Sequence, residues 1–287
     1  MTASSDSSSM AGVRDAVPPG LSDLVAPVAE AAENAREAWN TSEASFEQKR
    51  DGSRVTAVDR RLDRFLREVL EALGGGPVRS EEHRPAGPRG EMRDGWIVDP
   101  IDGTHPFTEG RDGFAVHVAH VTDGRPDRAI MALPARRELY AAARGEGAWR
   151  LSEEGGEAAR LELSAEADPV ARLPLAPSMP ARGRLARALD LEPGEFQRAM
   201  GPMIATLFWG ASRLAVGRRN VLYDWDLAAP ELVAAESGGT ITDLDGRTLR
   251  YGDPDPAHPG GVIATAPGLD HDRVRELLAD GPFGGGG

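Results

Sequence analysis

The stretch DGWIVDPIDGT, residues 94–104, predicts more about the fold than any other part of the chain. Its apolar residues predict a strand, and two carboxylates, Asp99 and Asp102, follow directly around a proline. Carboxylates fixed at a strand end suit Mg²⁺, which leaves room for waters and a phosphate. Gly103 would let the backbone approach a phosphate closely, and Thr104 offers an amide and a hydroxyl that can orient water. The stretch therefore predicts a magnesium site for a phosphate ligand.

Helical periodicity comes before this stretch and short apolar runs come after it. Apolar residues at three- and four-residue intervals predict helices over residues 21–45 and 58–73, and the glycine run at 74–76 ends the second. The polar segment 153–166 predicts a surface excursion. Short apolar runs separated by turns predict strands at residues 96–98, 114–121, 129–133 and 139–143.

The second half of the chain alternates between the two patterns. Strands are predicted at residues 173–176, 221–223, 240–242 and 262–264, and helices at 181–188, 193–200, 226–238 and 269–279. Helices, then an antiparallel-looking sheet, then an alternating half predict an α+β layered sandwich of two sub-domains that join between residues 150 and 169. We expect a disordered tail at 1–20, an N-terminal α+β sub-domain with the metal site at 21–150, a C-terminal α/β sub-domain at 151–283 and a flexible tail at 284–287.

The composition excludes several classes of function. The 33 basic and 46 acidic residues give a net charge of -13, so no broad basic surface is available for nucleic acid. An acidic enzyme with an anionic substrate needs local cations, either bound metal or a few placed arginines. Cysteine is absent, which excludes disulfides, thiolate zinc sites and cysteine nucleophiles. With neither a secretory signal nor a membrane-length apolar run, we expect a cytoplasmic protein with no membrane partner.

Four blocks in order carry a resemblance to a known family. DPIDGT at 99–104 is preceded by VTAVD at 55–59 and the Glu81-Glu82 pair, and it is followed by WDLAA at 225–229. Together they resemble the signature of the inositol monophosphatase superfamily, over most of residues 21–279. The resemblance implies the layered α/β/α/β/α sandwich of the inositol monophosphatase and fructose-bisphosphatase type. It also implies a homodimer, and Mg²⁺-dependent hydrolysis of a small phosphorylated metabolite.

The resemblance also implies roles for individual residues. Asp99 would bridge two of the two or three Mg²⁺ ions, and Thr104 with Glu81 would position and deprotonate the attacking water, with Asp59 supporting the site from the preceding helix. Only one residue of the Glu81-Glu82 pair should reach metal, because neighbours on a strand point opposite ways, and family position favours Glu81. The implied metal ligands are Glu81, Asp99, the Ile101 carbonyl, Asp102 and Asp226, and the implied phosphate contacts are Asp102, Gly103 and Thr104.

The chain departs from the family pattern near the substrate. His105-Pro106 replaces a common Thr-Asn pair, so His105 either contacts phosphate or faces solvent. Asp224 matches a carboxylate that binds a substrate hydroxyl in inositol-type relatives, although the loop before the Trp-Asp pair is shorter here. Ser212 lies in a small-residue turn that resembles the lining of the substrate pocket. Arg218 and Arg219 either meet an anionic substrate group or are solvated turn residues.

Several functions remain open at this stage. The substrate is predicted to be a sugar, cyclitol or nucleoside phosphate, and the alternatives within the class are a 3'-phosphoadenosine-type bisphosphate nucleotidase and a histidinol-phosphate phosphatase. A non-catalytic relative that binds a ligand on the same fold is the alternative from another class. Loss of a metal carboxylate would favour it, and Glu81, Asp99, Asp102 and Asp226 are all present.

Overall fold

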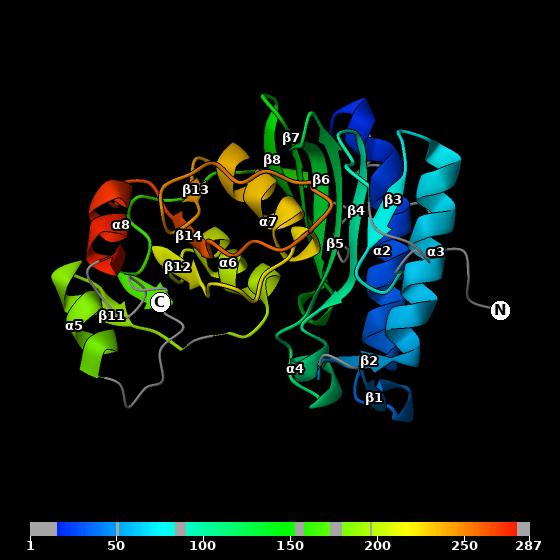
Figure 1. Ribbon diagram of the computed structural model, residues 1–287, viewed down its shortest axis with the longest axis horizontal. Helices are drawn as coiled ribbons and strands as arrows, with labels where there is room; N and C mark the ends of the chain where they lie inside the picture. Colours follow the sequence, from blue (N-terminus) through cyan, green and yellow to red (C-terminus); the bar gives the residue numbers. More distant parts are fainter. Residues whose placement is uncertain are drawn as a thin grey trace.

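The computed structural model describes residues 16–49, 52–83, 90–152, 158–172, 180–195 and 197–279. The two larger sheets and three helical layers alternate through the molecule (Figure 1). The tail predicted at 284–287 and the strand predicted at 173–176 lie outside the described residues. Helix α2 begins at Pro19, inside the segment predicted as a tail.

The first layer is a pair of helices, α2 (Pro19–Ala38) and α3 (Ala57–Leu73). Each buries one apolar stripe against the larger sheet, because its apolar residues recur with helical period. Helix α2 ends at Ala38, short of the predicted residue 45, and a 3₁₀ turn at Ser42–Ala44 follows. Strands β1 (Phe46–Gln48) and β2 (Arg54–Thr56) then form a hairpin that leads into α3. Helix α3 ends as predicted, at a glycine with a φ of 77°.

The larger sheet has seven strands in the order β3-β4-β5-β6-β7-β8-β9. Strand β3 is parallel to β4 and the remaining neighbours are antiparallel. The segment 153–166, predicted as a surface excursion, instead contributes the edge strand β9, so this sheet extends beyond residue 150. The strands are β3 (Val78–Ser80), β4 (Gly95–Asp102), β5 (Ala115–Thr122), β6 (Arg125–Leu133), β7 (Glu138–Ala143), β8 (Gly147–Ser152) and β9 (Ala158–Leu161).

Helices α6 (Met200–Phe208) and α7 (Asp224–Glu236) form the middle layer between the two sheets (Figure 1). A helix was predicted at 193–200 and a strand at 221–223, and both predictions are wrong. Residues 192–193 pair in a sheet and α6 begins where a helix was expected to end. Residues 221–223 follow a turn at 219–220 and form no strand, and a single bridge joins Tyr223 to Ala257.

The smaller sheet has five strands in the order β11-β10-β12-β14-β13. Helices α5 (Pro180–Ala188) and α8 (His271–Ala279) form the last layer on its outer side (Figure 1). The alternation of layers confirms the predicted α/β/α/β/α sandwich. The strands are β10 (Val170–Arg172), β11 (Glu192–Pro193), β12 (Leu214–Gly217), β13 (Thr240–Thr242) and β14 (Val262–Thr265).

Candidate active site

The end of β4 is the centre of the candidate site. Strand β4 is buried along its whole length, and its last residues carry Asp99 and Asp102. The pairing of β4 with β5 shifts between these two aspartates, which is an irregularity that ends the regular ladder there. Beyond β4 the short helix α4 (Thr104–Thr108) begins after Gly103, whose φ is 90°. An added Cβ at Gly103 would lie 2.7 Å from the Gly113 carbonyl oxygen, so the turn requires glycine.

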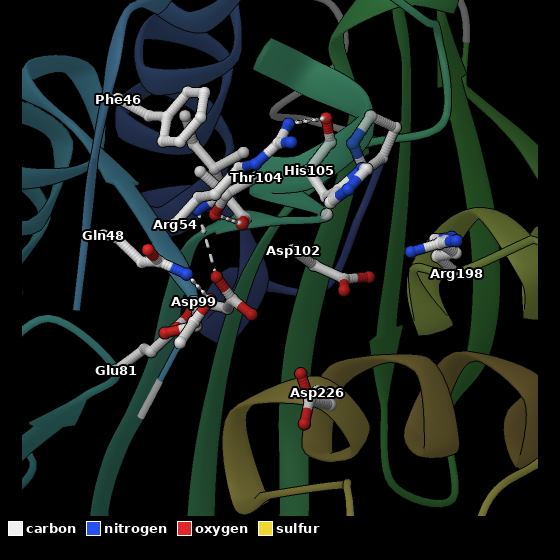
Figure 2. A pocket seen from close by; sticks show the side chains of 15 residues that line it. Phe46, Gln48, Arg54, Glu81, Asp99, Asp102, Thr104, His105, Arg198 and Asp226 are labelled. Carbon is white, nitrogen blue, oxygen red and sulfur yellow. Dashed lines mark hydrogen bonds between the residues drawn. The ribbon is translucent and has the colours of Figure 1, made fainter. Parts of the chain in front are cut away.

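Three carboxylates converge from two elements of the fold. Asp99 and Asp102 come from β4, and Asp226 comes from the first turn of α7. One oxygen of each lies within 4.8 Å of the others, which is the spacing of a metal site. Figure 2 shows Asp102 and Asp226 facing the same space from opposite elements. The structure thus brings together predicted ligands that are more than a hundred residues apart in the sequence.

Hydrogen bonds hold each of these carboxylates in place. Asp99 Oδ1 accepts from the Ile101 amide at 3.0 Å. Asp102 Oδ2 accepts from the Gly201 amide at 2.6 Å, so Asp102 also caps the first turn of α6. Asp226 Oδ2 accepts from the Tyr223 amide at 2.6 Å, at the start of α7. Both helices of the middle layer are therefore anchored through the carboxylates of the site.

Burial makes these carboxylates difficult to ionise together. The pKa of Asp99 lies well above its usual range, first because of burial and then because of the nearby Glu81 and Asp102. Burial raises the pKa of Asp226 in the same way, and Asp102 raises it further. The second oxygen of Asp99 is buried and has no hydrogen-bond partner among the described residues. A bound cation would supply the missing partner and relieve the repulsion.

A pocket of about 560 Å³, here called the acidic pocket, opens over the three carboxylates. Glu81 lines it and Glu82 does not, which supports the choice of Glu81. Lys49 Nζ holds both side chains, at 2.9 Å from Glu81 Oε1 and 2.5 Å from Glu82 Oε1. The predicted residues in the lining are Glu81, Asp99, Ile101, Asp102, Gly103, Thr104 and Asp226, and His105 lies beside them.

Thr104 and Asp59 form a buried pair at the edge of the acidic pocket. The Thr104 hydroxyl lies 3.1 Å from Asp59 Oδ1 and 3.2 Å from the Ile101 carbonyl oxygen. Asp59 also accepts from the amide of Thr56, at 2.8 Å, in the capping box of α3. Burial raises the pKa of Asp59 to about 6, against the hydrogen bonds from Thr56. The start of α3 thus fixes the orientation of Thr104.

Two of the predicted substrate contacts point away from this pocket. Asp224 is 2% exposed, and its carboxylate accepts from Arg79 at 2.7 Å and lies 3.0 Å from His258 Nε2. Asp224 and Asp226 both lie in the first turn of helix α7, where side chains two positions apart do not share a face. Ser212 is fully buried and bonds the Thr206 hydroxyl at 2.5 Å. Neither residue lines a pocket described here.

A second and larger pocket adjoins the first. This arginine pocket, of about 1440 Å³, shares Asp102, Pro106, Arg198 and Asp226 with the acidic pocket. Arg218 lines the arginine pocket, which is a position from which it could contact an anionic substrate group. Arg219 does not, and it donates to Asp245 Oδ1 at 2.6 Å. The arginines in the lining are Arg111, Arg182, Arg198 and Arg218.

Sequence reasoning missed several residues that contact the site. Lys49 holds Glu81, and Arg54 lines the acidic pocket while it donates to the Thr108 hydroxyl at 2.6 Å. Arg198 lines both pockets. His117 is buried with Nε2 at 3.6 Å from Asp102 Oδ2, and burial lowers its pKa to about 4. Only Arg54 and Lys49 had a usable signal, since Arg54 immediately precedes the VTAVD block and Lys49 lies six positions before Val55.

Comparisons with known proteins agree with this geometry. The family model described as inositol monophosphatase family matches residues 21–280. A histidinol-phosphatase of Mycobacterium tuberculosis is 30% identical over 239 residues, which cover 81% of this chain and 87% of the relative. A 3'(2'),5'-bisphosphate nucleotidase CysQ of Aggregatibacter actinomycetemcomitans is 30% identical over 238 residues, covering 80% and 87%.

A solved structure shares the fold. It is an IMPase/NADP phosphatase complexed with Mg²⁺ and phosphate, with a TM-score of 0.65 and 22% identity over 83% of this chain and 87% of that one. In the part of the chain that the structure describes, no helix has the length and apolar character needed to cross a bilayer. The family match spans nearly all the described residues and includes every element that carries the three carboxylates. The chain therefore belongs to the inositol monophosphatase family, a family of phosphoric monoester hydrolases.

Proposed function

We propose that this protein hydrolyses a small-molecule phosphate monoester with Mg²⁺ as its cofactor. The observation that carries the proposal is the convergence of Asp99, Asp102 and Asp226, with ligand oxygens within 4.8 Å of one another, at the base of an open pocket. An all-oxygen donor set of this kind suits Mg²⁺ and disfavours softer metals. The phosphatase relatives and the magnesium complex of a structural neighbour support both parts of the proposal.

The residues of the acidic pocket fit two or three Mg²⁺ ions. The unpartnered buried oxygen of Asp99 and the raised pKa values of Asp99 and Asp226 are what a site built for cations would have. When bound, Mg²⁺ would neutralise the charge of the phosphate and lower the pKa of a bound water. The proposed ligands are Glu81, Asp99, the Ile101 carbonyl, Asp102 and Asp226.

Thr104 is proposed to orient the attacking water. Its hydroxyl proton points to Asp59 or to the Ile101 carbonyl, so its lone pairs stay available to a water in the acidic pocket. Asp59 is proposed as the acceptor that keeps the hydroxyl in this orientation. Glu81 lines the same pocket and would accept the proton of the water. Thr104, held by Asp59, thus orients the water, and Glu81 accepts a proton from it.

The phosphate would be held by the turn after β4 and the alcohol part by the second half of the chain. Gly103 and Thr104 are proposed to contact the phosphate, because they line the acidic pocket beside Asp102. The alcohol part would extend into the arginine pocket, which shares a wall with the acidic pocket. Sugar, cyclitol and nucleoside phosphates all meet this description. The names of the relatives add a histidinol phosphate and a bisphosphate nucleotide to the candidates.

Dimerisation and cellular location stay predictions. A homodimer is implied by the family resemblance, and a cytoplasmic location is a prediction from the sequence. Light scattering on the purified protein tests the first, and fractionation of the producing cells tests the second. A monomer at micromolar concentration would contradict the dimer.

A phosphate-release screen with and without Mg²⁺ tests the proposed function. The substrates would be an inositol phosphate, histidinol phosphate, a sugar bisphosphate and a 3'-phosphoadenosine nucleotide. We expect release from at least one in Mg²⁺ and none in a chelator, because the carboxylates alone would repel the phosphate. Full turnover in chelator would contradict the mechanism. No release from any substrate, together with no Mg²⁺ binding, would favour a non-catalytic relative.

A further inference from the structure

The wall of the arginine pocket gathers arginine side chains in a protein that is acidic overall. Four arginines line it, and apart from the shared Asp102 and Asp226 the acidic residues in its described lining are Asp112 and Glu195. The four arginines balance the four acidic residues of the lining, so they place local positive charge beside the acidic pocket in a chain of net charge -13. The four arginines are Arg111, Arg182, Arg198 and Arg218.

Two of these arginines are already engaged by the protein. Arg111 donates to Glu109 Oε2 at 2.6 Å, and Arg182 donates to the Gly194 carbonyl. Arg198 and Arg218, by contrast, have neither a hydrogen bond nor an ion pair with any described residue. Their side chains are exposed, so they are available to a ligand that enters the pocket.

Arg198 connects the two pockets. It lines both, and Figure 2 shows it across the acidic pocket from Glu81, with Asp102 between them in this view. A phosphate held beside Gly103 and Thr104 would leave its alcohol part facing Arg198 and then Arg218. Guanidinium groups only donate hydrogen bonds, and their planar fork matches a carboxylate or a phosphate. A cationic amine at the same place would be repelled by both side chains.

We infer that the arginine pocket receives a second anionic group, a phosphate or a carboxylate, on the alcohol part of the substrate, and that Arg198 and Arg218 recognise it. The inference rests on the proposed phosphatase function and narrows its substrate to phosphate monoesters with two anionic groups. It also separates two candidates, since histidinol phosphate carries an amine where this pocket offers guanidinium groups.

Matched pairs of substrates test the inference. Adenosine 3',5'-bisphosphate is compared with adenosine 3'-monophosphate for a second phosphate, and 2-phosphoglycerate with glycerol 2-phosphate for a carboxylate. The measured quantity is the ratio of kcat/KM within a pair, in Mg²⁺. We expect a ratio above about 10 in at least one pair, and about a tenfold fall in that ratio in Arg218→Gln and in Arg198→Gln, as for the loss of a charge-assisted hydrogen bond. The pair that responds identifies the anion.

Arg219→Gln is the matched control, because Arg219 is adjacent in sequence but is bonded to Asp245 outside the pocket. In Arg219→Gln, the ratio of kcat/KM within each substrate pair should keep the wild-type value. A wild-type ratio near one in both pairs would overturn the inference while the phosphatase function stands. A fall confined to Arg219→Gln would overturn the assignment of residues. Failure to release phosphate from all four substrates and from the wider screen would instead overturn the proposed function, and the inference with it.

Discussion

Asp99 is the residue whose environment is least suited to a protein without bound metal. One of its oxygens accepts from the Ile101 amide, while the other is buried without a hydrogen-bond partner among the described residues. Its carboxylate is also crowded by Glu81 and Asp102, which raise its pKa beyond the effect of burial. A carboxylate in this state destabilises the folded protein when it is ionised. Its presence therefore indicates a role in function and not in the stability of the fold.

Replacing Asp99 by Asn tests this interpretation. We expect Asp99→Asn to lower kcat by roughly 10³-fold or more, because it removes a charge that stabilises the bound cations. The stability of the metal-free protein should stay the same or rise, since crowding is relieved. Phosphate release and thermal unfolding in chelator measure the two effects. Near-normal turnover in a folded Asn variant would contradict the proposed role.

Thr104 permits a sharper test at a single atom. Thr104→Val keeps the shape of the side chain and removes the hydroxyl that contacts Asp59, so kcat should fall by about 10²- to 10⁴-fold. KM should change little, because the backbone amide of residue 104 remains. Thr104→Ser retains the hydroxyl and should recover most of the activity. Equal losses in the Val and Ser variants would show that packing, and not the hydroxyl, matters at this position.

At the scale of elements, the start of α7 is held by a buried ion-pair network. Arg79 of β3 and His258 both contact the Asp224 carboxylate, and the Gly252 amide donates to it at 3.1 Å. Asp226 lies in the same helical turn as Asp224. The network therefore joins the larger sheet to the helix that presents a proposed metal ligand.

Removing Asp224 should destabilise the fold strongly. Asp224→Ala would leave the buried Arg79 guanidinium without its partner, and losing one partner of a buried pair costs about 3 to 5 kcal/mol. Asp245→Ala breaks the exposed pair with Arg219 and should cost less than about 1 kcal/mol. Urea unfolding monitored by circular dichroism compares them. An Asp224→Ala variant of normal stability but raised KM would favour the substrate role expected from the sequence.

The elements that the sequence predicted well have a clear apolar pattern. Helices α3 and α8 bury one face and show helical periodicity, while strands β4 to β7 are short, largely buried apolar runs between turns, and all were predicted within a few residues. Helix α6 was missed because it is buried on nearly all sides between two sheets, so its sequence has no polar face to reveal a period. Strand β9 was missed because it is an edge strand of four residues inside a polar segment, which resembles a surface loop.

The candidate site was predicted where its residues are local and missed where they are distant. Asp99, Asp102 and Thr104 belong to one turn, so their spacing carries the chemistry. The contacts of Asp102 with the start of α6, and of Asp224 with Arg79, join residues about a hundred or more positions apart. No local pattern reports such contacts, because only the packing of the two halves creates them.

At the scale of the whole molecule, the site lies where the two halves of the chain meet. The larger sheet supplies Asp99 and Asp102, and α7 supplies Asp226. Helix α6 depends on Asp102 for its cap, so the second half folds against a carboxylate of the first. The repulsion among these groups therefore acts across the interface between the halves, and a bound cation would stabilise the molecule as a unit.

This arrangement predicts a stability that depends on pH and on Mg²⁺ together. Asp99 and Asp226 have folded pKa values above those of the unfolded chain, where an aspartate titrates near about 4. Their contribution to the free energy of unfolding is complete below the pKa of the unfolded chain. It is lost as the pH rises through the pKa of the folded state. The buried His117 acts in the opposite direction, because its lowered pKa costs stability only as pH falls below about 6.5.

Above about pH 6.5, the titration of Asp99 and Asp226 should therefore determine how the stability of the protein changes with pH. We expect the Tm of the metal-free protein to fall as the pH rises above about 6.5, because the folded state still holds protons on Asp99 and Asp226 that the unfolded chain has released. Mg²⁺ binds the ionised form, so at about 100 times its Kd it should add about 2.7 kcal/mol and flatten the fall. Calorimetry at several pH values, with chelator or Mg²⁺, measures both effects.

Asp99→Asn and Asp226→Asn should each reduce the fall in Tm and weaken the response to Mg²⁺, since the cation needs ligands from both halves. A metal-free Tm that stays constant or rises over this range would contradict the buried, mutually repelling cluster on which the proposed site depends.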